Sequence, residues 1–335
     1  MINPGRDACG EGIIIPVPCD EHNYYLHANF TSMKRLFLVI PVLLLACSPG
    51  KKPATTENQY KAELMEWVTK REAALKAPNG WLNLVGLHWL EEGDNTFGSD
   101  AGNKIVFPQG KIAGHAGVFR REGKSVTLLP AAGVDIRDTR TGQPFAGGMI
   151  FHPDSTRSEE LTAGDLRWTI IRRGELLGIR LRDDRAQTLT EFHGVPRFPV
   201  DMRWRTAAVR VPDRSANGNG TLTILNVLGQ ETAEKSGGVF RFRLGNGMYE
   251  LEAIDDGSNE LFIVFGDQTN GEATYGGGRF LYIPRPDADG KTIIDFNKAI
   301  NPPCVFTAFA TCPLPPRQNR LHLKIEAGEK VEGVH

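Results

Sequence analysis

The side chains best suited to chemistry lie in two short stretches near the end of the chain. Arg279 follows a run of three glycines, and Asp295 and Asn297 lie two residues apart on the next apolar segment. Residues two apart on a strand face the same side, so Asp295 and Asn297 are expected to point the same way. A guanidinium binds a carboxylate through two parallel hydrogen bonds. We therefore predict that Arg279 meets either Asp295 in a buried ion pair or a ligand carboxylate.

Two further side chains could take part in acid–base chemistry. His88 lies in the apolar stretch Leu87-His88-Trp89-Leu90, where it is either a core histidine or joins Tyr275 and Asp295 in a pocket as acid, base or ligand donor. The sequence has no G-x-S-x-G, H-E-x-x-H or Walker motif. The residues therefore leave open whether the protein is an enzyme, and they predict no cofactor and no metal site.

Two cysteines bound a proline-rich loop. Cys304 follows Asn301-Pro302-Pro303, and Cys312 precedes Pro313, so the loop between the thiols is short and stiff. We predict a disulfide, which would stabilise the fold by roughly 2–3 kcal/mol in the loop-entropy model. The alternative is a reactive thiol pair, but the spacing is not C-x-x-C and no second pair completes a zinc site.

The loop that begins at Asn301 starts four residues after Asn297 and can fold over the side that Asp295 and Asn297 share. We expect a polar cleft between two β-rich halves, capped by this loop, in which Arg279 anchors an anionic or carbonyl group of a small ligand. His88 joins only if the halves pack with their apolar faces together. The alternative is a structural ion-pair network of the same residues.

Three segments carry a resemblance to a known family. They are GWLNLVGLHWLEEGDNTFGSD (80–100), TYGGGRFLYIP (274–284) and DFNKAINPPCVFTAFATCPLPPRQNRL (295–321). From about Trp67 to Glu329 the chain resembles an uncharacterised bacterial and archaeal family, domain-of-unknown-function family number 1684. The resemblance implies a β-rich, often exported protein without an established activity. The residues matching its pattern are Gly86, His88, Trp89, Tyr275, Gly277, Arg279, Asp295, Asn297, Asn301, Cys304, Cys312 and Arg320.

A second resemblance concerns the first half. Three segments resemble the sequence pattern of a forkhead-associated β-sandwich: NTFGSDAGNKIVFP (95–108), GHAGVF (114–119) and LTAGD (161–165). That family reads phosphothreonine with an arginine and a serine at places held here by Ser99 and Ile112, and only His115 fits. The resemblance implies a shared fold and a protein-interaction module, while its phosphopeptide-binding residues are not in place.

The elements that must position these residues are mostly strands. The chain has 37 glycines and 21 prolines between short alternating segments, which favours a mainly β, sandwich- or barrel-like fold. One helix is predicted over 57–76, with Thr56 and Gln59 as a capping box and Pro78 ending it. We place the N-terminal helix region at 57–78, the first β-rich half at 79–200 and the second at 201–335.

Strands are predicted where short apolar runs alternate with polar residues and end at turn residues. The predicted ranges are 81–90, 104–107, 118–121, 125–129, 166–172, 177–182, 206–211, 221–226, 239–244, 248–253, 261–265, 280–283, 292–296 and 321–325.

The stretch MKRLFLVIPVLLLAC (33–47) is typical of a lipoprotein signal peptide. It has a basic start and a short apolar run, and Leu44-Leu45-Ala46-Cys47 resembles the bacterial lipobox. We expect 33–46 to be removed, Cys47 to be lipidated and 47–56 to be a tether. Residues 1–32 are then an upstream extension from a start codon placed too early.

The net charge and the residue after Cys47 restrict the possible partners and the location of the protein. The formal net charge is −1, which argues against a nucleic-acid partner because such proteins carry a basic stripe. We expect a lipid-anchored protein of the cell envelope, on the outer membrane facing the periplasm because Ser48 rather than aspartate follows Cys47. Its partners are then the membrane, through the lipid, and a small ligand or envelope protein. A hydrolase-like enzyme with a His88-centred pocket remains the alternative.

Overall fold

A computed structural model describes residues 56–154, 158–212, 214 and 218–331 of the chain. The predicted upstream extension, the signal peptide and Cys47 lie outside the described residues. No helix within these described ranges is long and apolar enough to cross a membrane.

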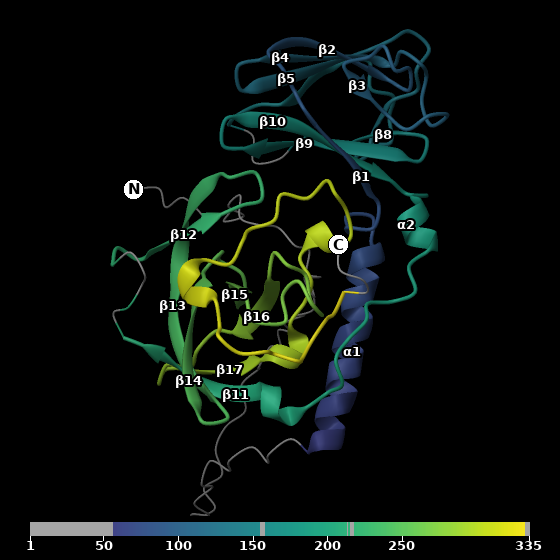
Figure 1. Cartoon of the computed structure of the whole chain (residues 1–335). Coiled ribbons are helices and arrows are strands. Elements are labelled where there is room, and N and C mark those ends of the chain that lie inside the picture. The colour runs from purple at the N-terminus through teal and green to yellow at the C-terminus, as the bar shows by residue number, and fades with distance from the viewer. Residues whose placement is uncertain (1–55, 155–157, 213, 215–217, 332–335) are drawn as a thin grey trace, which may run out of the picture.

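The predicted N-terminal helix is confirmed as α1, Glu57–Lys76. The Thr56 hydroxyl accepts from the backbone N–H of Gln59, and the Gln59 side chain accepts from the backbone N–H of Thr56, so the capping box is complete. One face buries Tyr60, Leu64 and Leu75. In Figure 1 this helix runs along the second half and ends near the first half.

The first half is a sandwich of two five-stranded sheets. One sheet has the order β1 (Leu84–Trp89), β10 (Leu176–Asp183), β9 (Leu166–Arg173), β8 (Leu161–Ala163) and β6 (Arg137–Asp138). The other has the order β3 (Ile105–Val106), β2 (Gly93–Gly98), β4 (Gly117–Glu122), β5 (Ser125–Pro130) and β7 (Gly148–Phe151). Their facing sides share one core, in which the ring centroid of Phe97 lies 4.3 Å from that of Phe119 and 6.2 Å from that of Trp168.

The second half is built on one seven-stranded antiparallel sheet. Its order is β16 (Arg279–Pro284), β15 (Glu260–Phe265), β14 (Gly247–Ile254), β13 (Glu231–Leu244), β11 (Arg205–Val211) and β17 (Lys291–Asp295), with β12 (Thr221–Leu225) paired to the first part of β13. Strands β16 and β17, at the two ends of this order, lie against each other, so the sheet curls almost into a barrel. Its interior is filled by aromatic and aliphatic side chains such as Phe242, Phe265 and Phe296.

A third apolar cluster joins the two halves. It combines Trp81 and Leu84 at the start of the first half with Leu222 and Ile224 of β12, and it includes Cys312 of the proline-rich loop. The chain crosses between the halves through the short helix α2 (Gln187–Thr190) and the segment that follows it. The described part also contains four 3-10 turns, at Met202–Trp204, Phe296–Lys298, Pro303–Val305 and Arg317–Asn319.

The mainly β fold with one N-terminal helix is confirmed, although some elements differ from the prediction. Strands β2, β6, β7 and β8 were not predicted, because their segments are short or rich in glycine and charged residues. The strand predicted at 321–325 is wrong. Leu321 and Ile325 are buried in the core of the second half, but this segment is irregular and forms no ladder.

Candidate functional site

Arg279, the predicted ligand anchor, lies fully buried inside the second half. Its Nη2 donates to Asp267 Oδ2 at 2.7 Å and to the carbonyl of Ile325 at 2.9 Å, and its Nη1 donates to the carbonyl of Ala327. The side chains of Arg279 and Asp267 are both 0% exposed. The prediction of an ion pair with Asp295 is therefore wrong in its partner. The irregular segment from 321 to 327 explains the difference, because two of its carbonyls, those of Ile325 and Ala327, accept from the guanidinium.

Asp295 and Asn297 form a separate polar cluster. Asp295 accepts from the hydroxyl of Tyr60 at 2.8 Å, which joins the sheet to α1. Burial and this carboxylate raise the pKa of Tyr60 above its ordinary value. Asn297 donates to the carbonyl of Asp201 and accepts from its N–H, at 2.9 and 3.2 Å. These contacts hold α1 and residue 201 on the sheet, and neither side chain is among the residues that line the cavity described below.

His88 does not join the other candidates. It pairs in register with Ile179 on the core side of the first sandwich, and its ring centroid lies 6.0 Å from that of Phe107. Burial lowers the pKa of His88. The expected grouping of His88 with Tyr275 and Asp295 is wrong, since the ring faces the core of the other half. Arg320 is exposed and likewise lies away from the cavity described next.

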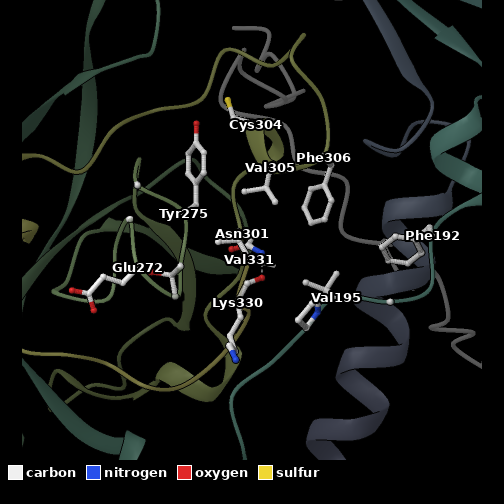
Figure 2. Close-up of a pocket in the computed structure, with 15 residues that line it drawn as sticks. Phe192, Val195, Glu272, Tyr275, Asn301, Cys304, Val305, Phe306, Lys330 and Val331 are labelled. Atoms are coloured by element: carbon white, nitrogen blue, oxygen red, sulfur yellow. Dashed lines mark hydrogen bonds between the residues drawn. The ribbon is translucent and has the colours of Figure 1, made fainter. Parts of the chain in front are cut away.

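Two of the predicted residues, Tyr275 and Asn301, do line a common space. It is a cavity of about 330 Å³ in the second half. Figure 2 shows Tyr275 on one side, Phe192 and Val195 on the other, and Asn301 between them. The residues around it are Phe192, Gly194, Val195, Pro196, Gly271, Glu272, Thr274, Tyr275, Gly276, Asn301, Cys304, Val305, Phe306, Lys330 and Val331.

Asn301 is fixed by three hydrogen bonds. Its backbone N–H donates to Glu329 Oε2 at 2.6 Å, its carbonyl accepts from Arg71 at 3.2 Å, and its Nδ2 donates to the carbonyl of Lys330 at 2.9 Å. The Lys330 carbonyl requires a donor, so the amide orientation is set and Oδ1 is the remaining atom. Oδ1 is buried and has no hydrogen-bond partner among the described residues. The cavity wall thus contains one rigid, unpaired acceptor.

A buried charge network supports this asparagine from behind. Glu329 is 0% exposed and lies within 3.2 Å of Arg71 and 3.6 Å of Arg197. Arg71 comes from α1, and its guanidinium also lies over the ring of Phe306, 5.7 Å from the centroid. The network links helix, cavity wall and C-terminal segment, so the position of Asn301 does not depend on its own loop alone.

The predicted disulfide between Cys304 and Cys312 is confirmed, with the two Cα atoms 6.3 Å apart. It closes the proline-rich loop whose 3-10 turn, Pro303–Val305, supplies Cys304 and Val305 to the cavity. The loop is also held on its outer side, because the Thr307 hydroxyl donates to the carbonyl of Leu84 at 2.9 Å. One wall of the cavity is therefore a covalently closed loop.

The charged side chains at the cavity are already engaged. Glu272 pairs with Lys324 at 2.6 Å, and the ammonium of Lys330 lies 5.3 Å from the ring centroid of Phe198. Cys304 is oxidised, and none of the described lining residues is a histidine. No nucleophile–base pair is present in this set. The arrangement is suited to holding an apolar molecule with a hydrogen-bond donor.

Several lining residues were not predicted. Phe192, Val195 and Pro196 come from the crossing segment after α2, and Val331 comes from the C-terminal end. They belong to no polar motif, and only the tertiary fold brings them to Asn301. The sequence pointed to this cavity only through the proline-rich loop and the two residues Tyr275 and Asn301.

The forkhead-associated resemblance can be checked at its binding loops. His115 is exposed, and its Nδ1 lies 3.2 Å from Asn103 Oδ1. The hydroxyl of Ser99 donates to the carbonyl of Ile112 at 2.9 Å, within the loops themselves. This serine therefore takes part in local loop structure.

Comparisons with known proteins add the family. No curated protein matches the chain. The solved structures with detectable similarity include the solution NMR structure of the uncharacterized protein from gene locus rrnAC0354 of Haloarcula marismortui. It is 28% identical, with 44% of this chain and 80% of that chain covered and a TM-score of 0.36. The model of the family described as "Protein of unknown function (DUF1684)" matches residues 190–330, which include most of the cavity lining. This match is to the same family that the sequence motifs indicated, and it covers residues 190–330.

Proposed function

We propose that the protein binds a small, mostly apolar molecule with one hydroxyl or amide N–H in the cavity at Asn301. The observation that carries this proposal is the buried, unpaired Oδ1 of Asn301 in the cavity wall. A buried acceptor without a partner costs about 1–3 kcal/mol, and such groups are rare in folded proteins. A ligand N–H or O–H would remove this cost.

The size and lining of the cavity support the same class of ligand. Small-molecule sites are typically cavities of about 300–1,000 Å³ with apolar walls and few polar groups. Phe192, Val195, Val305 and Phe306 supply the apolar walls here. The ion pairs at Glu272 and Glu329 leave no unpaired carboxylate at the described wall for a cationic ligand. The proposed ligand is thus mostly apolar, whereas the sequence predicted a polar ligand anchored by Arg279.

Binding is favoured over catalysis for a chemical reason. Hydrolysis requires a nucleophile and a base within hydrogen-bond reach of each other. The two charged lining side chains, Glu272 and Lys330, are engaged with other groups, and His88 faces the core of the first half. A pocket that orients a ligand by one acceptor is a carrier or sensor site.

The test uses two neutral fluorescent probes of similar size. N-phenyl-1-naphthylamine has an apolar body and one N–H donor, and 1-phenylnaphthalene lacks the donor. We expect Asn301→Leu to weaken binding of the first probe by about 3- to 30-fold, the equivalent of one hydrogen bond. Binding of the second probe should hardly change.

Two control variants sharpen the result. Val195→Phe places a ring in the cavity and should abolish binding of both probes. Glu250→Gln changes a carboxylate outside the cavity that pairs with Arg214 and Arg241, and it should leave both affinities unchanged. Equal affinities of wild type and Asn301→Leu for the amine, or normal binding by Val195→Phe, would contradict the proposal.

The proposed cellular setting is the cell envelope, with Cys47 carrying a lipid at the start of the mature chain. The support is the lipobox-like Leu44-Leu45-Ala46-Cys47 after a basic and apolar stretch. The intact mass of protein extracted from membranes should correspond to a chain that begins with acylated Cys47. Cys47→Ser should remove the acyl mass and release the protein from the membrane fraction. Retention of residues 1–32 in the mature protein would disprove this.

A further inference from the structure

A second site is indicated on the outer face of the first half, where the sheet meets the proline-rich loop. In β9 and β10, Thr169 pairs with Arg180, and Arg173 and Arg182 are an even number of residues away on the same strands. Side chains two or four apart on a strand share a face. Arg173, Arg180 and Arg182 therefore lie together on the side opposite the core residues Trp168, Ile179 and Leu181.

Two of these three arginines have acceptors. Arg182 donates to the carbonyl of Gly80 and to Asn83 Oδ1, and Arg173 donates to the hydroxyl of Thr311 at 3.1 Å. Arg180 is different: its guanidinium stacks over the ring of Trp81, 5.5 Å from the centroid. Among the described residues it has no ion pair, and its buried Nε has no acceptor.

Trp81, like Arg180, has a buried hydrogen-bond donor without an acceptor. It is 7% exposed, and its indole Nε1 is a second buried donor without an acceptor among the described residues. Two stacked side chains thus present two unpaired donors at one place. Burial and the charges of Arg173 and Arg182 lower the pKa of Arg180 to about 9, so the surroundings of Arg180 are electropositive.

We propose that Arg180, with Trp81 and Arg173, binds a small oxyanion group, either phosphate or carboxylate, at the seam between the first half and the proline-rich loop. A guanidinium donates two parallel hydrogen bonds to such a group, and the anion would also accept from the indole. Thr311, which Arg173 already contacts, belongs to the disulfide loop, so the anion would lie beside the outer side of that loop. This site is separate from the cavity at Asn301.

The experiment follows the indole ¹H–¹⁵N signal of Trp81, assigned by its loss in Trp81→Phe. The full protein is titrated with inorganic phosphate and, in parallel, with acetate, while sodium chloride keeps the ionic strength constant. We expect a saturable shift with at least one of the two ions. The ion that binds more tightly identifies the tetrahedral or the planar group as the ligand class.

Three variants separate this site from general charge effects. Arg180→Met should weaken binding at least about tenfold, since it removes charge-assisted hydrogen bonds. Arg180→Lys retains the positive charge but loses the two parallel N–H donors of the guanidinium. It should bind more weakly than wild type but more tightly than Arg180→Met. Arg120→Met removes a charge from an exposed ion pair with Asp94 on the other sheet and should bind like wild type.

Circular dichroism confirms that each variant is folded. If Arg180→Met does not fold, the anion affinity of Arg180→Lys is compared with that of Arg120→Met, and a weaker affinity of Arg180→Lys supports the proposal. The proposal is wrong if neither ion produces a saturable shift, or if Arg120→Met loses as much affinity as the Arg180 variants.

Discussion

The cluster around Arg279 and the cavity wall at Asn301 both contain buried polar groups, but only Asn301 lines the cavity. Arg279 is surrounded by Asp267 and two carbonyls, which satisfy both terminal nitrogens, while its buried Nε has no partner among the described residues. Asn301 is held as firmly, yet its Oδ1 is left without a partner. The buried guanidinium of Arg279 therefore stabilises the fold. The proposed binding site is instead indicated by an unpaired oxygen on Asn301, a neutral residue of the cavity wall.

The largest expected effect that tests this comparison is on stability. Arg279→Met leaves Asp267 buried without its cation, and breaking a buried ion pair costs about 3–5 kcal/mol. Urea unfolding should show this loss in the free energy of unfolding. Binding of N-phenyl-1-naphthylamine to the folded fraction should be unchanged.

The double variant Arg279→Met/Asp267→Leu sharpens this test. It replaces the pair by apolar side chains and should recover most of the lost stability, because both charges are removed together. A loss of probe binding by folded Arg279→Met would mean that Arg279 belongs to the site after all.

The next effect concerns the loop that forms one cavity wall. Cys304→Ser/Cys312→Ser should lower the free energy of unfolding by about 2–3 kcal/mol, since the short loop is no longer closed. It should also weaken probe binding, because Cys304 and Val305 line the cavity. Thermal unfolding and probe titration measure the two effects. Unchanged affinity would show that the Thr307–Leu84 hydrogen bond is enough to hold the wall.

A smaller effect is expected where α1 meets the sheet. Tyr60→Phe removes the hydrogen bond to Asp295 and leaves the carboxylate with the N–H of Asn297 and the more distant Arg205. We expect a loss of about 1–2 kcal/mol in urea unfolding. Probe affinity should stay at the wild-type value, since this cluster, like that of Arg279, is structural. A drop in affinity would contradict the division between the two regions.

The smallest effect is a pH dependence at His88. Burial lowers its pKa in the folded protein, so between its unfolded and folded pKa values the unfolded chain binds the extra proton. The stability contributed by the neutral ring is therefore present above about pH 6.5 and is lost as the pH falls through the folded pKa. His88→Gln should reduce the slope of stability against pH in this window by at most about 1.4 kcal/mol per pH unit. An unchanged slope would show that the ring is more solvated than its packing against Phe107 indicates.

Local patterns predicted much of the fold. The capping box at Thr56 and Gln59 fixed the start of α1, and the glycines between paired strands marked hairpins such as the β13–β14 turn at Gly245. Segments such as Gly93–Gly98 were missed because glycine and charged residues disfavour strands on their own, and only pairing with β3 and β4 makes this one a strand.

The site was less accessible to prediction than the fold. Tyr275, Asn301 and Cys304, which stood out in the sequence because their segments are polar and rigid, line one cavity. Arg279 was given the wrong partner, since the carbonyls that surround it come from a segment with a strand-like sequence that forms no strand. The contribution of Phe192 and Val195 could not be predicted, because it depends on how the crossing segment packs.

The helix α1 has a consequence for the boundaries of the family match. Residues 190–330 contain Asp295, Glu329 and Asn301, whereas Tyr60 and Arg71, which bond to them, lie outside this range. A fragment cut at residue 190 would lose both partners and an apolar helix face, so we expect it to be less stable than the same region in the whole chain. Supplied as a separate peptide, the helix should complement such a fragment, in the way that two pieces of a split protein restore each other.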